Sequence, residues 1–319
     1  MDRSNQPKPN PNPEPSSKGK RGRLKASAQI DARRGVARQD MALGLAGLIR
    51  PKIQAKRDKK GRLTGGRQYV EGLPQTWAGG DIIWSGPQLD AFDLQVHLAC
   101  QALALQASCD GETKLTQGAN VAGLLVKPPK GGQANMADDR LTLELETSMS
   151  AVCLLIGRSP DDGRAHISIR ASLTRLASIV VTASQDDEAA FTHLIGGGAF
   201  SGRNAIRLTL SYRLTQAVLG EGSYARIRLA EFARLNPVAQ LVYHWLACWR
   251  PGAGSCKPIG LDKLAAHVWG ACEDGATVRE RRQQLKAALA SLPDDEWDIK
   301  LLDGNLVQIT RKKGLLCAA

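Results

Sequence analysis

The sequence predicts an α+β, mainly helical fold in which one arrangement, two helices followed by a small antiparallel β-hairpin, occurs twice. Three observations predict it. Apolar residues recur at helical spacing in several segments, β-branched runs flank Gly- and Asp-containing turns, and the elements follow the same order in both halves. With 319 residues, 43% of them hydrophobic, the chain is long enough for two folded domains of ordinary size.

The first predicted elements are a short helix, a strand and a longer helix. Residues 41–49 are apolar enough for the short helix, and residues 81–84 form a β-rich run closed by Ser85-Gly86-Pro87. Pro87 suits the first turn of the next helix, where its missing N–H has no cost. That helix is predicted for residues 89–107, because its apolar residues recur at spacings of three and four.

The first copy of the repeated arrangement is predicted in the middle of the chain. A helix capped by Ser148 or Ser150 and a helix over residues 164–176 flank the turn GRSPDDG. Strands over 178–183 and 191–195 then form a hairpin. A strand remains an alternative for the second helix, because its middle alternates between polar and apolar residues.

The second copy is clearer. In chain order, its elements are a strand over 225–229, helices over 230–235, 237–249, 259–269 and 277–292, and strands over 297–302 and 306–310. Thr277 with Glu280 three residues later predicts a capping box for the last helix. Asp303-Gly304 between two β-rich runs is a strong hairpin signal. Helix, turn, helix and hairpin are typical of a winged helix-turn-helix, so two tandem domains of this kind with small wings are expected.

This order gives a division of the chain into two domains and two tails. The predicted parts are a disordered basic Pro/Asn/Lys-rich tail over residues 1–40, a first winged-helix domain over 41–221, a second over 222–314 and a C-terminal tail over 315–319.

The basic charge of the chain is concentrated near its N-terminus. Residues 1–67 hold 18 Lys and Arg against 5 Asp and Glu, whereas the remaining 252 residues hold 25 against 26. The net charge of +12 is therefore an N-terminal property. A basic arm of this kind binds phosphates without reading sequence, and a solubilising tail is the alternative.

The helix over 277–292 carries the candidate DNA-reading residues. Its apolar residues cluster on one side, and Arg279, Arg282, Gln283 and Lys286 fall on the other. In a helix-turn-helix the second helix enters the major groove, where Arg suits guanine, Gln suits adenine and Lys more often meets phosphate. Arg281 falls within the apolar arc, which favours a buried stem with an exposed head, or a phosphate contact. A merely solvated helix face is the alternative.

Further candidates follow from the same arrangement. They are Arg164, Ser168 and Arg175 on the corresponding helix of the first domain, and Arg311, Lys312 and Lys313 at the end of the second hairpin. Of these, Arg164, Ser168, Arg175, Arg311 and Lys312 are assigned to DNA binding.

Other functional classes lack their motifs. The five histidines form no His-x-His or His-x-x-x-His pair, and Gly196-Gly197-Gly198 is not followed by the Lys and Ser/Thr of a phosphate-binding loop. No metal, cofactor or catalytic residue is predicted, and the expected function is not enzymatic. Seven cysteines without a Cys-x-x-Cys pair indicate free thiols in a reducing cytoplasm. No apolar run reaches the roughly 18 residues of a membrane helix, and the N-terminus has no secretory signal.

Several stretches resemble the replication initiator (Rep) proteins of IncQ-type broad-host-range plasmids. They are residues 83–87 with 93–94, 214–219 (LTQAVL), 225–229, 240–249, 263–269 and 278–283 (VRERRQ). The resemblance covers roughly residues 36–311 and is strongest after Ile206.

The resemblance implies two winged-helix domains that bind directly repeated origin sequences (iterons). It also implies opening of an adjacent AT-rich segment, so that a plasmid-encoded helicase and primase load. The family's DNA-reading helix in the second domain matches Arg279, Arg281, Arg282, Gln283 and Lys286, and residues 164–176 match that of the first. A monomer or weak homodimer is expected. The alternatives are a winged-helix transcriptional repressor and, with less support, a metal-dependent DNA-nicking enzyme.

Overall fold

Helices and antiparallel sheets make up the fold, which confirms the predicted α+β class. The computed structural model describes residues 26–52, 56–57, 63–64, 66–77, 80–117, 141–185, 188–221, 223–271 and 274–313. The predicted tail segments 1–25 and 315–319 lie outside the described residues.

Ten α-helices are present in the described part of the chain. They are α1 (Ala26–Arg33), α2 (Met41–Leu45), α3 (Ala91–Asp110), α4 (Met149–Leu155), α5 (Gly163–Ala177), α6 (Tyr212–Leu219), α7 (Leu229–Arg234), α8 (Pro237–Trp249), α9 (Leu261–Trp269) and α10 (Gly275–Ala290). The segment 164–176, for which a strand was an alternative, is therefore helical.

The described strands pair antiparallel within five sheets. The first nine are β1 (Val36–Asp40), β2 (Lys56–Arg57), β3 (Leu63–Thr64), β4 (Tyr69–Trp77), β5 (Gly80–Pro87), β6 (Lys114–Gln117), β7 (Leu141–Ser148), β8 (Val180–Gln185) and β9 (Glu188–His193). The others are β10 (Ile195–Ser201), β11 (Ala205–Leu210), β12 (Tyr224–Arg228), β13 (Gly254–Ser255), β14 (Ile259–Gly260), β15 (Trp297–Leu302) and β16 (Leu306–Arg311). The sheets run β1-β12, β2-β3, β4-β5-β8-β9, β10-β11-β7-β6 and β13-β16-β14, with β15 also paired to β16.

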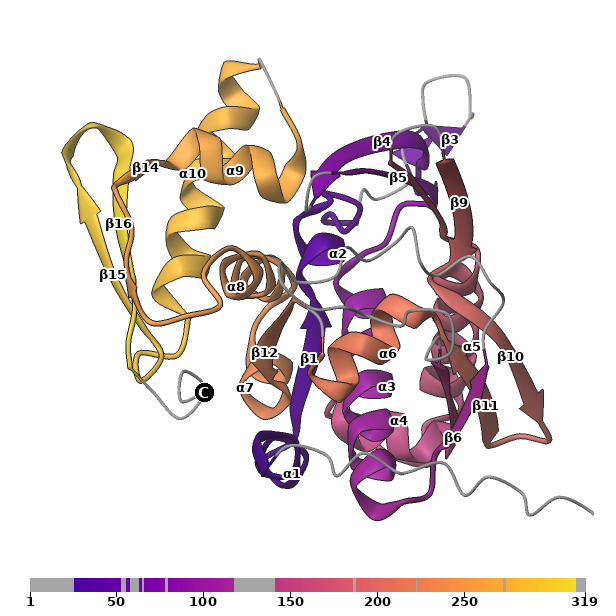
Figure 1. Cartoon of the computed structure of the whole chain (residues 1–319). Coiled ribbons are helices and arrows are strands. Elements are labelled where there is room, and N and C mark those ends of the chain that lie inside the picture. Colours follow the sequence, from indigo (N-terminus) through magenta and orange to yellow (C-terminus); the bar gives the residue numbers. More distant parts are fainter. Residues whose placement is uncertain are drawn as a thin grey trace, which may run out of the picture.

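The β1–β12 pair lies between two groups of elements. Figure 1 shows α8, α9, α10 and the β14–β16 strands, in orange to yellow, on one side of this pair and the two larger sheets on the other. The apolar core is continuous through both groups. The division of the chain at residue 221 stays a prediction, and the pairing of Val36 with Arg228 joins residues from both sides of it.

The predicted tail is too long at its C-terminal end, because residues 26–40 fold. All five residues of β1 are buried, and its charges have partners. The Arg38 guanidinium lies 2.9 Å from the Asp31 carboxylate of α1, and Asp40 lies 2.9 Å from Arg213 of α6. Composition alone did not indicate that these charges pair, and buried charges are tolerated only when they do.

The long helix α3 is central to the first group of elements. It packs against α1, α5, α6 and β1, and Asp90 caps its N-terminus by accepting from the backbone N–H groups of Phe92 and Asp93. The Asp93 carboxylate accepts in turn from the Asp90 N–H, which completes a capping box. Pro87 belongs to the end of β5 and not to the first turn of this helix, so its predicted position is corrected.

Helix caps differ partly from those predicted. Ser148 caps α4 by accepting from the Ala151 N–H at 3.1 Å, which confirms one of the two serines proposed. The cap of α10 is Asp274, which accepts from the Thr277 N–H at 2.9 Å. The predicted Thr277–Glu280 capping box is therefore wrong, and α10 begins two residues earlier, at Gly275. No described helix has both the length and the apolar character that crossing a membrane requires.

Candidate nucleic-acid interface

Helices α9 and α10 and the β15–β16 hairpin follow one another around a small core. Leu264 and Val268 of α9 and Leu285 and Leu289 of α10 are buried. The chain turns between the helices at Gly270, whose φ of +84° is rarely adopted by other residues. A Cβ there would lie 2.9 Å from the end of the flexible Arg50 side chain, which can move, so the conformation is what favours glycine.

The outer face of α10 carries three of the predicted DNA-binding residues. Arg279, Gln283 and Lys286 are exposed at spacings of four and three, opposite the buried Leu285 and Leu289. Within the described part of the chain, neither Arg279 nor Lys286 makes an ion pair. This face therefore presents cationic and amide donors to solvent.

The two neighbouring arginines of α10 are bound to the protein itself. Arg281 is half-buried and donates from Nη1 to the Gly270 carbonyl at 3.0 Å. Arg282 donates from Nε and Nη2 to the two Asp262 oxygens, each at 2.5 Å. The hydrogen bond from Arg282 lowers the pKa of the Asp262 carboxyl and raises the pKa of the guanidinium. Arg282 can meet a base only if this pair opens.

The end of the hairpin contradicts one predicted contact. Arg311 is 1% exposed and donates to Glu296 Oε1 at 2.5 Å and to the Arg250 carbonyl at 2.6 Å. Glu296 also accepts a hydrogen bond from the Tyr243 hydroxyl at 2.6 Å. Burial, and to a lesser extent the negative charge of Glu296, raises the pKa of Tyr243. Arg311 is therefore an internal anchor of β16 and is not available to DNA. Lys312 and Lys313 are exposed, although the Lys312 ammonium donates to the Asp294 carbonyl.

Helix α5 presents the corresponding face in the first group of elements. Asp162 caps it by accepting from the Arg164 N–H at 2.9 Å. Arg164 and Ser168 are exposed, as their prediction requires, and Ile167 beside them is 69% exposed. Arg175 shares this face but is held by Asp93 of α3, with Nη2 at 2.6 Å from Oδ1.

Helices α5 and α10 border one cleft of about 860 Å³, which Arg279, Gln283 and Lys286 do not line. Ser168 and Arg175 line it from α5, and Gln284 lines it from α10. Four basic side chains belong to its wall: Lys52, Arg67, Arg158 and Arg175. Among the described residues of the wall Asp90 is the one acidic residue, so this part of the cleft has an excess of positive charge.

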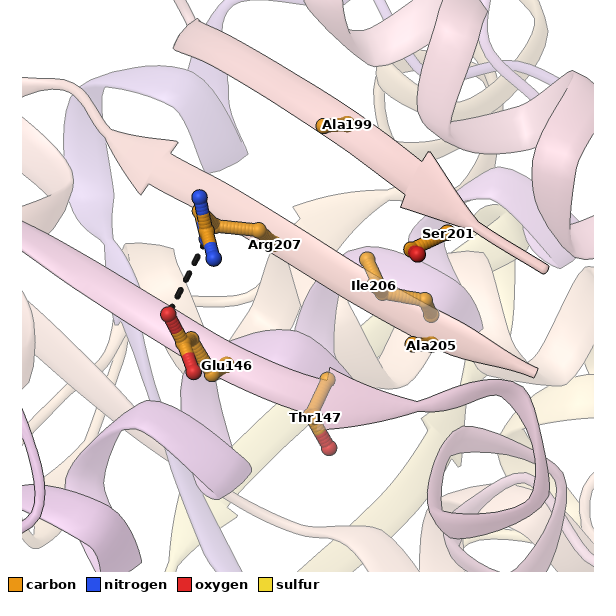
Figure 2. Close-up of a pocket in the computed structure, with 7 residues that line it drawn as sticks. All are labelled: Glu146, Thr147, Ala199, Ser201, Ala205, Ile206 and Arg207. Atoms are coloured by element: carbon orange, nitrogen blue, oxygen red, sulfur yellow. Dashed lines mark hydrogen bonds and ion pairs between the residues drawn. The ribbon is translucent and has the colours of Figure 1, made fainter.

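A second hollow, of about 490 Å³, lies over the β7, β11 and β10 strands and has a different character. Figure 2 shows Arg207 directed toward Glu146 on the neighbouring strand, at 3.0 Å, with the small side chains of Ala199, Ser201 and Ala205 nearby. The charges in this hollow balance each other. In the described part of the chain, no cluster of three or more His, Cys, Asp or Glu residues is placed to hold a metal ion.

A family model described as Replication protein C (RepC) matches residues 133–313, more than half of the chain. The chain belongs to the RepC family. The match includes α5, α9, α10 and both hairpins beside them, whereas Lys52, Arg67 and Asp90 of the cleft precede the matched part of this RepC-family chain. A replication protein is the class that the resemblance of the sequence implied. No match was found among curated proteins.

Solved structures share the fold of this RepC-family chain. A crystal structure of selenomethionine derivatives of domains 2 and 3 of RctB covers 86% of this chain and 98% of its own, with a TM-score of 0.54 at 11% identity. Another structure of RctB domains 2–3 covers 84% and 96%, with a TM-score of 0.51 at 11% identity. At this identity the likeness concerns the fold alone.

Sequence reasoning missed part of the cleft. In the sequence, Lys52 and Arg67 contribute only to the positive charge of residues 1–67, and Arg158 is only part of the turn GRSPDDG before α5. Gln284 lies one position from the predicted stripe of α10. The sequence did contain a signal that Arg158 lies near the start of α5, because it belongs to the same turn as Asp162, which caps that helix. No signal in the sequence connects Arg67 with α5.

Proposed function

We propose that this chain is a plasmid replication initiator that binds directly repeated origin DNA (iterons) sequence-specifically. The observation that carries the proposal is that α5 and α10, which border one basic cleft, each present exposed basic and polar side chains. The orders α4–turn–α5–hairpin and α9–turn–α10–hairpin support two tandem winged helix-turn-helix units. Membership of a replication protein family supports the role in replication.

In this proposal α10 enters the major groove of one part of the repeat. Arg279 suits the O6 and N7 acceptors of guanine, Gln283 suits adenine, and Lys286 suits a phosphate. Arg164 and Ser168 of α5 contact the other part. Two units in one chain fit a direct repeat, whereas a symmetric dimer fits an inverted one.

The wider role follows from the proposed class and from the resemblance to IncQ-type initiators. Binding promotes opening of an adjacent AT-rich region, onto which a plasmid-encoded helicase and primase load. The protein acts in the cytoplasm as a monomer or weak homodimer. No cofactor takes part.

Gel shifts with a cognate direct-repeat duplex and a scrambled duplex, at one physiological salt concentration, test the DNA-binding part. The repeat is expected to bind at least 10³-fold more tightly, the lower end of the range for specific recognition. Equal affinity for the two duplexes would contradict sequence-specific binding. Permanganate reactivity of the AT-rich segment tests opening, and binding without reactivity would indicate a transcriptional repressor instead.

We also propose that the chain acts by binding and not by cleavage, because no nucleophile motif was found in its sequence. Supercoiled plasmid carrying the origin is expected to stay supercoiled after incubation with the protein and Mg²⁺. Nicked or linear product would contradict this and favour a metal-dependent nicking enzyme.

A further inference from the structure

The cleft between α5 and α10 contains an arginine pair fixed from behind by a buried carboxylate. The side chain of Asp93 is fully buried, and its oxygens lie 2.6 Å from Arg175 Nη2 and 2.7 Å from Arg67 Nη1. Arg67 also reaches Asp90, with Nη2 at 2.5 Å from Oδ2. The two arginine side chains are 27% and 23% exposed, and both line the cleft.

This arrangement holds two cations at the surface of the cleft. An unpaired buried carboxylate is costly, so Asp93 keeps both arginines in place. Arg175 uses Nε and Nη2 for Asp93, and its Nη1 makes no hydrogen bond to any residue that the structure describes. Planar guanidiniums with donors remaining suit phosphate oxygens.

Lys52 and Arg158 are two further cations in the cleft. Both are exposed, and within the described ranges neither forms an ion pair. They lie in the wall of the same cleft as Arg67 and Arg175. The four side chains therefore form a basic seat in the cleft that α5 and α10 border.

We propose that this seat binds the sugar-phosphate backbone of the duplex between the segments read by α5 and α10, with Asp93 as the residue that positions Arg67 and Arg175. This rests on the proposed function. If both helices enter the major groove of one duplex, the backbone between the two contacts passes along the cleft that they border. Phosphate contacts of this kind fix the register of the protein on DNA and carry no sequence information.

The test is the salt dependence of binding by the full chain, measured by fluorescence anisotropy with a cognate repeat and a scrambled duplex. The double variant Lys52→Ala/Arg158→Ala is expected to lower the slope of log K against log salt by about 2, since each phosphate contact contributes about 0.9. The ratio of cognate to scrambled affinity should not change. The matched control is Arg33→Ala/Arg207→Ala, which removes two exposed charges outside the cleft and should leave the slope unchanged.

An unchanged slope in the Lys52/Arg158 variant, with wild-type protein that prefers the repeat, would overturn the seat and leave the proposed function intact. Wild-type protein without a preference would instead overturn the proposed function. Asp93→Asn is expected to weaken binding to both duplexes by the same factor, as measured on protein whose circular dichroism matches the wild type. If that variant binds both duplexes like the wild type, Asp93 has no positioning role. If it fails to fold, the Lys52/Arg158 variant decides.

Discussion

Helices α5 and α10 border the same cleft but hold their arginines in different ways. Arg175 of α5 is bound to the fully buried Asp93, whereas Arg282 of α10 is bound to Asp262, whose side chain is 55% exposed. Opening the first pair leaves a buried charge, and opening the second exposes two charges that water solvates. The comparison indicates that α5 presents a fixed guanidinium, while α10 presents side chains that can rearrange on a base pair.

The hairpins beside the two helices differ as well. The β8–β9 hairpin after α5 joins a four-stranded sheet through β5, so its register is supported by strands from earlier in the chain. The β15–β16 hairpin after α10 pairs otherwise with the two-residue strands β13 and β14. It is held by the buried side chains of Trp297, Val307 and Ile309 and by the buried pair of Arg311 and Glu296. The second hairpin therefore depends more on side-chain contacts than on strand pairing.

The largest effect expected from a single substitution is at Arg311. Arg311→Ala removes the closer charge partner of the buried Glu296 and leaves Arg228 Nη2 at 3.4 Å, so it should lower the free energy of unfolding by about 3 kcal/mol. Urea denaturation at pH 7 measures it. Lys313→Ala, an exposed lysine two residues away, should change stability little. Equal stability of Arg311→Ala and wild type would show that the pair does not anchor the hairpin.

A second effect tests the contact between the two groups of elements, where His97 of α3 and His244 of α8 are buried. Burial lowers the pKa of His97 to about 4. The pKa of His244 is lowered to about 3, mainly by burial and also by repulsion from the neighbouring His97. In the unfolded chain both titrate near pH 6.5, so below that pH the unfolded state binds more protons. Stability should fall as the pH drops from 6.5 toward 4, by about 3 kcal/mol for each histidine over the window.

Urea denaturation at pH 7, 6 and 5 follows this loss. The double variant His97→Gln/His244→Gln should be less sensitive to pH over the same range, whatever its stability at pH 7. The same pH dependence in variant and wild type would assign the acid sensitivity to other groups.

The third effect sharpens the comparison of the two helices on DNA. Arg279→Ala should cost about 1–3 kcal/mol at particular base pairs of the repeat, and Arg164→Ala should act at different positions if each helix reads its own segment. Binding to a panel of single-substituted repeats measures this. A loss uniform over the panel would mark either arginine as a phosphate contact. Arg282→Ala on the same panel shows whether the Asp262 pair opens on DNA.

The smallest effect on sequence preference concerns the N-terminal arm. Deletion of residues 1–25, which hold seven basic and two acidic side chains, should flatten the salt dependence of binding and leave the preference for the repeat unchanged. A deletion to residue 38 would also remove α1 and most of β1, so it would not separate charge from folding. An unchanged salt slope would favour the solubilising role.

Local pattern predicted much of the fold. The helices α3, α5, α8, α9 and α10 and both hairpins follow from apolar spacing and turn residues. Strand β10 was not predicted, because Gly196-Gly197-Gly198 is typical of a loop, and in the structure it is paired along β11. Strand β4 contains Gly72 and Pro74 and gave no strand signal either.

The candidate site was predictable only where a helix presents its own side chains. Arg279, Gln283 and Lys286 share a face by helical geometry alone. The partners of Arg175 and Arg311 were not predictable, because Asp93 is 82 residues from Arg175 and the charge of Arg311 suggested exposure. Pairing between distant charges depends on the tertiary structure, and it decides which arginines are available to a ligand.

The pairing of β1 with β12 has a consequence for how the protein is made. During synthesis, β1 leaves the ribosome on the order of 190 residues before β12, about 10 seconds or more at usual elongation rates. Over that time Arg38 lacks the strand that covers it, and the backbone N–H and C=O groups along the edge of β1 are open to other nascent chains. A chain that ends before residue 224 never closes this edge, so shortened translation products of this gene are expected to aggregate or to require chaperones.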